Sequence, residues 1–434
     1  MAYWLKPLLP SLALLSLQAQ APLTLPEAIH QAWTGQSGLQ AGAAMVARAA
    51  AEGAAMRDLR LPTVTLGAGL TRTNEPMMAF GTKLDQARIG QMDFMPSALN
   101  HPDPITGAGG FLTVAQPLYA GGRLDAARKA GAAMAGAEAA AQAHRKQQVA
   151  LAVAQAYFGA QVAESALAYA TDTLKQAEET EHFVQARVDQ GLMLASEGDR
   201  TRAFRAQSQA GVAEARNRVA SARSALALLM GSDSTQARLT TPLSGPAPEL
   251  GAGPGHRADL EATRLQGVAA KAGVAAARGG LKPEVGLTLT AGTARYAFNS
   301  GGNWTTAALG AKWTFTFADT QRVHAARAAA RAAELGLQWQ EAQASREVQE
   351  ARRGLETAQA KIAFAQVAVT ASESVRALRT ARHREGLLPL MDVLDAESGL
   401  QGARTLLLNS QLEFRLSQAQ LALALGQPIE GVKE

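Results

Sequence analysis

One long stretch of the chain repeats apolar residues at alternating intervals of four and three, as closely packed helices do. The positions that follow this spacing are Val149, Val153, Ala156, Ala160, Ala163, Leu167, Ala170, Leu174 and Ala177. Such a seam faces a neighbouring helix, and small residues in it let two helices approach closely. We therefore predict a helix over 123–189, which at 1.5 Å per residue extends roughly 100 Å.

The remaining helical pattern predicts one further long helix and four shorter ones. The long helix spans 320–384, and the shorter helices span 23–57, 197–230, 257–280 and 389–425. In each half of the chain the two shorter helices together match the length of the long one, so we expect them to lie end to end beside it. A globular domain does not need a rod of this length, whereas a protein that spans a compartment does.

Four segments alternate apolar with small or polar residues, which predicts strands at 62–73, 110–119, 283–298 and 304–318. Val285 and Leu287 begin one apolar face, and Trp313, Phe315 and Phe317 end another. The pattern suits a barrel wall between lipid and water, and it also suits a half-buried sheet in a soluble domain. Since a barrel needs about eight strands, four strands cannot close one. A membrane barrel would require two or three copies of the chain.

The two halves of the chain are internally similar. The segment RLDAAR at Arg123–Arg128 matches RVHAAR at Arg322–Arg327, 199 residues later, and Gly191-Leu192 matches Gly386-Leu387, 195 residues later. Near-constant offsets through the helices indicate a duplicated unit. We predict a first repeat at 22–230, a Pro/Gly-rich linker at 231–256, a second repeat at 257–426 and a C-terminal tail at 427–434.

The N-terminus has the features of a secretory signal peptide. Lys6 precedes an apolar segment from Leu8 to Leu17, and small residues follow at Ala19 and Ala21. The alternative is a short membrane anchor, but about ten apolar residues are too few to span a bilayer. We predict that residues 1–21 are a signal peptide and that the protein is exported.

Composition excludes several functional classes. The 434 residues include no cysteine, which excludes disulfides, thiolate metal sites and cysteine nucleophiles. The net charge of +5 comes from mixed charges without a basic block, so nucleic acid is not an expected partner. The seven histidines have no metal-ligand spacing, and no nucleophile–base set is present. We expect neither an enzyme nor a cofactor.

Residues 74–109 form a predicted loop that is rich in methionine. It contains Met77, Met78, Met92, Met95 and His101. Thioethers bind soft metals such as copper or silver. The other interpretation is that methionine and phenylalanine pack this loop over the outer mouth of a barrel.

Each long helix ends at a break that contains glycine, and the second break is followed by two carboxylates. Gly386 ends one helix and Pro389 begins the next. Asp392 then lies in a first helical turn, where a carboxylate favours the helix dipole. Asp395 is one turn further on the same face. A helix cap explains the first carboxylate, and a narrow acidic mouth of a pore would explain both.

Several motifs together resemble the TolC family of outer-membrane efflux proteins over nearly the whole mature chain. They are the opening helix LTLPEAIHQAW (Leu23–Trp33), the strand-to-helix segment QPLYAGGR (Gln116–Arg123), and the breaks GLMLASEGD (Gly191–Asp199) and GLLPLMDVLD (Gly386–Asp395). The resemblance implies a mixed α/β membrane protein. Three chains would form a helical barrel across the periplasm and a transmembrane β-barrel with four strands from each chain.

The resemblance also implies roles for particular residues. Asp392, Asp395 and Glu197 would form the acidic ring of a periplasmic gate, while the family's gate arginine and tyrosine are replaced by Leu388 and His383. The adaptor-docking tips would be Gly191, Leu192, Gly386 and Leu387. The strand-to-helix turn would be formed by Pro117, Gly121, Gly122 and Arg123.

We therefore predict a passive exit duct of a tripartite efflux or type I secretion system. Its expected partners are two further copies of itself, a periplasmic adaptor, an inner-membrane pump and outer-membrane lipid. The alternative is a periplasmic adaptor or coiled-coil scaffold that never enters the membrane.

Overall fold

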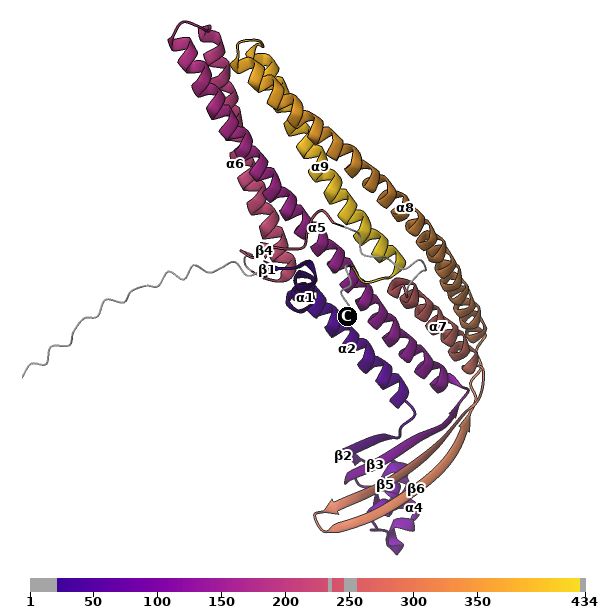
Figure 1. Ribbon diagram of the computed structural model, residues 1–434. Helices are drawn as coiled ribbons and strands as arrows, with labels where there is room; N and C mark the ends of the chain where they lie inside the picture. The colour runs from indigo at the N-terminus through magenta and orange to yellow at the C-terminus, as the bar shows by residue number, and fades with distance from the viewer. Residues whose placement is uncertain (1–21, 233–235, 246–255, 430–434) are drawn as a thin grey trace, which may run out of the picture. The chain divides into compact units, whose positions relative to one another are not determined.

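The computed structural model describes residues 22–232, 236–245 and 256–429 (Figure 1). Its helices are α1 (Leu25–Gly35), α2 (Ser37–Asp58), α3 (Pro76–Asp85), α4 (Pro96–Asn100), α5 (Arg123–Asp189), α6 (Ala195–Met230), α7 (Ala258–Gly279), α8 (Phe317–Arg384) and α9 (Leu390–Leu425). A 3-10 turn, η1, spans Gln91–Phe94. The strands are β1 (Pro22–Leu23), β2 (Thr63–Thr73), β3 (Ile105–Ala120), β4 (Arg238–Leu239), β5 (Glu284–Ala297) and β6 (Ser300–Lys312).

The chain divides into two compact units, and both halves of the sequence contribute to each. The helical unit comprises Met1–Gly42, Ala143–Arg257 and Gln343–Glu434, and the strand unit comprises Ala43–Gln142 and Ala258–Ala342. The predicted signal peptide lies outside the described residues, as do parts of the predicted linker and tail.

The strand unit is built on a four-stranded antiparallel sheet in the order β2-β3-β5-β6. In the central pair, Thr113 lies opposite Thr290, and their hydroxyls are 3.1 Å apart. The register between β3 and β5 shifts between Pro117 and Tyr119. Such a bulge accommodates proline in a central strand, since proline has no N–H to donate to the ladder.

The last strand is shorter than its sequence pattern predicts. β6 ends at Lys312, which pairs with Glu284, the first residue of β5, so no partner strand extends beyond this point. Thr316 then caps α8: its backbone N–H and its hydroxyl donate to Asp319 Oδ2 at 3.1 and 2.7 Å. The prediction that Trp313, Phe315 and Phe317 belong to a strand face was therefore wrong.

The segment predicted as a loop at 74–109 contains ordered short helices. It includes α3, η1 and α4, and Phe80 packs edge-to-face on Phe94 at 5.8 Å. The buried Gln86 donates its amide to the carbonyl oxygens of Thr106 (3.0 Å) and Arg295 (3.2 Å), which ties the segment to two strands. Met77, Met78, Met92 and Met95 are exposed, so aromatic and polar contacts hold the segment rather than methionine packing.

The core of the helical unit surrounds Tyr157 and Phe158 on α5. Tyr157 is fully buried, donates its hydroxyl to the Leu23 carbonyl at 2.7 Å and accepts from the Thr241 N–H at 2.9 Å. These bonds position the parallel β1–β4 pair beside the helix. The single helix predicted at 23–57 is instead two helices, because Gln36 between α1 and α2 is extended.

Two antiparallel helix hairpins make up most of the helical unit. In the first, α6 meets α5 through Arg223–Glu164 (2.6 Å) and Arg205–Glu181 (3.1 Å). In the second, α9 meets α8 through Lys361–Glu413 at 2.8 Å. The four helices of these hairpins, α5, α6, α8 and α9, are labelled in Figure 1.

Candidate functional site

The two hairpin turns have the same backbone geometry. Gly191 and Gly386 both adopt positive φ, 72° and 79°. At the first turn the N–H groups of Gly191 and Leu192 donate to the carbonyls of Val188 and Arg187; the second turn repeats both bonds 195 residues later. This is the Schellman ending of a helix, which requires a left-handed residue and therefore favours glycine. Leu192 and Leu387 follow the glycines and are each 68% exposed.

The acidic residues predicted at the gate lie directly beyond these turns. Glu197 is the third residue of α6, and Asp392 is the third residue of α9. Asp392 Oδ1 lies 3.8 Å from a guanidinium nitrogen of Arg379, which also donates to the Asp392 carbonyl at 3.1 Å. Asp395 is exposed and has no ion pair among the described residues. The two aspartates therefore differ, because Asp392 is held by Arg379 of α8 whereas Asp395 is exposed to solvent.

His383, at a position that the resemblance assigned to the gate, is buried between the hairpins. Its Nδ1 lies 2.8 Å from the Leu388 carbonyl oxygen, and its Nε2 is buried without a hydrogen-bond partner in the described part of the chain. The His383 ring packs edge-to-face on Phe183 of α5 at 6.0 Å. The guanidinium of Arg187 lies over the Phe183 ring, and Arg187 also donates a hydrogen bond to the Arg384 carbonyl at 3.1 Å. An aromatic contact thus joins the two hairpins near their ends.

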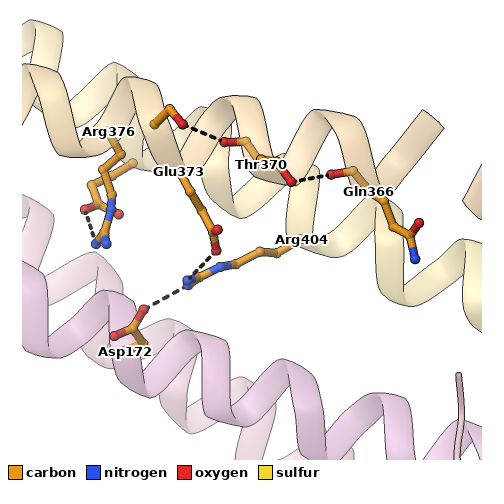
Figure 2. Close-up of polar contacts among 8 residues, drawn as sticks. Asp172, Gln366, Thr370, Glu373, Arg376 and Arg404 are labelled. Atoms are coloured by element: carbon orange, nitrogen blue, oxygen red, sulfur yellow. Dashed lines mark hydrogen bonds and ion pairs between the residues drawn. The ribbon is translucent and has the colours of Figure 1, made fainter. Parts of the chain in front are cut away.

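A cluster of ion pairs also joins the hairpins (Figure 2). Arg404 of α9 donates to Asp172 of α5 at 2.8 Å and lies 3.5 Å from Glu373 of α8. Its guanidinium lies 4.8 Å from the ring centroid of Tyr169. The Arg404 side chain is only 15% exposed, so solvent screens these contacts less than ordinary surface pairs. Through this residue α9 contacts both α5 and α8.

Beside this cluster, Glu397 is a buried carboxylate. Arg376 of α8 donates to it at 3.2 Å, and the Glu397 side chain is 9% exposed. Burial raises the pKa of Glu397 above its usual 4.5, against the opposing effect of Arg376.

The raised pKa predicts that Glu397 contributes more to the stability of the helical unit as the pH falls from 7 toward 4.5. The folded state binds the Glu397 proton more tightly than the unfolded chain, so this stabilisation is complete below 4.5 and is lost as the pH rises through the folded-state pKa. Glu397→Gln keeps an acceptor for Arg376 and should flatten this dependence in thermal unfolding followed by circular dichroism. The exposed Glu385→Gln is the control, and an equal flattening in both variants would contradict the assignment.

The third predicted group, at the strand-to-helix turn, lies in the strand unit. Gly121 and Gly122 have φ of 63° and 88°, and α5 begins at the next residue, Arg123. A Cβ on Gly121 would overlap the carbonyl of Gly279 at the end of α7, whereas a Cβ on Gly122 would have open space. Arg123 forms an ion pair with Glu284 at the start of β5. Pro117 precedes this turn at the bulge of β3.

Sequence reasoning missed Arg379, Arg376 and Glu397, although a signal for them exists. If the chain reverses direction at Gly386-Leu387, residues at similar sequence separations before and after this break lie opposite each other in an antiparallel hairpin. Asp172, a partner of Arg404, gives no such signal, because it belongs to the other hairpin. Within the described residues, no group of three or more histidine and acidic side chains has the arrangement of a metal site. No helix described here is long and apolar enough to cross a membrane.

Comparison with known proteins identifies a family and a fold. A family described as outer membrane efflux protein matches residues 28–232 and 255–427. The fold is similar to that of CusC, with a TM-score of 0.80 at 20% identity over 94% of this chain and 93% of CusC. No curated protein sequence matches the chain.

Two further outer-membrane proteins have a similar fold. VceC from Vibrio cholerae has a TM-score of 0.78 at 21% identity, covering 94% of this chain and 97% of VceC. MtrE from Neisseria gonorrhoeae, in its open state, has a TM-score of 0.79 at 21% identity, covering 94% of this chain and 91% of MtrE. The fold predicted from the sequence, long helices joined to four strands, is confirmed.

Proposed function

Because this chain belongs to the outer membrane efflux protein family, we propose that it is a passive duct whose gate is formed by the hairpin ends of its helical unit. The chain is an outer-membrane efflux channel, as predicted from its sequence. We further propose how the chain assembles, where its gate lies and which kinds of protein it binds.

The proposed assembly is a trimer that closes a barrel of twelve strands. Support comes from the sheet, in which β2 and β6 are edge strands with no further partner among the described residues. Leu66, Leu70 and Leu309 are exposed on these strands, as a lipid-facing wall requires. An open edge cannot remain in a bilayer, because its backbone groups would have no hydrogen-bond partners. Three copies would join β2 of one chain to β6 of the next.

The proposed gate is an acidic ring contributed by three chains. The observation that carries it is the exposed carboxylate of Asp395 beyond a hairpin turn, one helical turn from the Arg379-bound Asp392. Glu197 would add a third carboxylate from the other hairpin. A ring of carboxylates around a narrow mouth favours cations and repels anions. The salt bridge to Arg379 would hold Asp392 in place while leaving Asp395 to face the ions.

The proposed docking sites for a periplasmic adaptor are the turns themselves. Leu192 and Leu387 offer exposed apolar side chains directly after a glycine, at two places related by the internal repeat. A partner helix tip can bury such residues. An inner-membrane pump would supply the energy, since we infer no catalytic site for this chain.

Conductance measurements on the purified protein in planar bilayers test the gate. The Asp392→Ala/Asp395→Ala variant is expected to lose most of the cation selectivity of the wild type, because the carboxylates that attract cations are gone. The control Glu214→Ala/Glu350→Ala removes the same charge from exposed pairs within single helices. Unchanged selectivity in the aspartate variant would refute the ring, and failure of folded protein to insert would refute the duct.

A further inference from the structure

A charged cavity of about 580 Å³ lies in the strand unit. It is bordered by the start of β5, the end of β6 and the first turns of α5 and α8. Its volume is in the range of sites that hold small organic ligands.

Cations outnumber carboxylates in the lining of the cavity. The charged residues are Arg123, Lys282, Lys312, Arg322, Glu284 and Asp319. Both carboxylates are already engaged. Glu284 pairs with Arg123, and Asp319 accepts from Arg322 at 2.6 Å as well as from Thr316.

Lys282 and Lys312 are the two remaining cations. Neither forms an ion pair with any described residue, although Lys312 lies directly opposite Glu284 in the strand register. The carboxylate of Glu284 is instead occupied by Arg123, so the two ammonium groups border the cavity without compensation. An anion bound at the cavity would supply the counter-charge that both lysines lack among the described residues.

We propose that this cavity is a binding site for an anion of the phosphate class, held by Lys282 and Lys312. A lysine ammonium binds phosphate oxygens as a point charge with three donors. Thr314, which also lines the cavity, supplies a hydroxyl as a neutral donor. Arg123 and Arg322 keep the local potential positive by neutralising the two carboxylates.

The face of the sheet indicates how the anion would reach the site. Near the C-terminal end of β6, Lys312 shares its face of the strand with Gly310, Ala308 and Thr306, which are small or polar, whereas Leu309 lies on the other face; Trp304 lies further along the same face as Lys312. In the proposed barrel the small and polar face borders water. Only this last step rests on the proposed function; the cavity and its charges belong to the single chain.

Calorimetric titration of the purified full-length protein with inorganic pyrophosphate tests the site. Lys282→Met/Lys312→Met is expected to weaken binding by about tenfold or more, since two charge-assisted contacts are lost. Lys282→Arg/Lys312→Arg should retain binding. Lys129→Met/Lys271→Met removes the same charge from exposed helix positions outside the cavity and should leave the affinity unchanged.

A second titration distinguishes a soluble anion from a lipid headgroup. The same variants are compared for co-sedimentation with vesicles of phosphatidylglycerol and of phosphatidylcholine. Loss confined to pyrophosphate supports a soluble anion, and loss confined to phosphatidylglycerol supports a headgroup phosphate. No difference between the lysine variant and its control in either titration would overturn the site. Because no conductance is measured, this result is independent of whether the gate proposal fails.

Discussion

The Gly121→Ala variant is expected to lose most of its folded yield. Gly121 has a φ of 63°, which costs a residue with a Cβ roughly 1–2 kcal/mol. The new methyl group would also overlap the Gly279 carbonyl, which is backbone at the end of α7 and cannot rotate away. Such overpacking adds about 1–3 kcal/mol. The measurement is the amount of folded protein recovered from the outer-membrane fraction, with its apparent unfolding midpoint.

The neighbouring glycine provides a matched control. Gly122 also has positive φ, 88°, but no other atom lies within 4 Å of where its Cβ would be. Gly122→Ala should therefore be destabilised only by the cost of placing an alanine at positive φ. Equal losses in the two variants would mean that backbone conformation alone accounts for the effect and that the close approach to α7 is unimportant.

The second large effect is expected for Arg404→Met. The substitution keeps much of the side-chain volume but leaves Asp172 and Glu373 without their shared cation, beside the buried Glu397. We expect the contact between the hairpins to weaken by about 1–3 kcal/mol, a value reduced because Asp172 and Glu373 are about half exposed. If these hairpins form the gate, conductance in planar bilayers should rise.

Two comparisons separate this effect from a general loss of charge. Arg346→Met removes an exposed pair with Glu350 inside α8 and should change neither stability nor conductance measurably. Asp172→Asn combined with Arg404→Met should be less destabilised than the two single changes added together. Simple additivity would show that the residues act independently, and the proposed link between hairpins would then be wrong.

Local sequence signals predicted the ends of the long helices well. Gly191 and Gly386 end α5 and α8 because only a residue without a Cβ enters the left-handed conformation readily. A different local signal was overlooked at the start of α8. Thr316 and Asp319 form a capping pair there, although the alternation of apolar residues continues past Thr316. The alternation of apolar residues alone predicted a β6 that extends too far, because alternation does not indicate where the partner strand begins.

Contacts between distant segments were not predictable from one sequence. Arg404 and Asp172 are 232 residues apart and belong to different hairpins, so no spacing brings them together. The same holds for Gln86, whose amide joins an ordered segment to two strands in a region predicted as a loop. The acidic residues were found by their motif, but Arg379, which distinguishes Asp392 from Asp395, was missed because the residues across the hairpin break were not paired with one another.

The two open edges of the sheet have a consequence for how the protein is produced. In the proposed trimer each chain contributes β2 to one seam and β6 to another, so a barrel closes only when all three seams form. A chain with a damaged edge would then be harmful in a mixture with intact chains. If half of the chains carried such a defect, roughly one assembly in eight would contain none, by random selection of three subunits. An allele that damages β2 or β6 would therefore be dominant over the normal one.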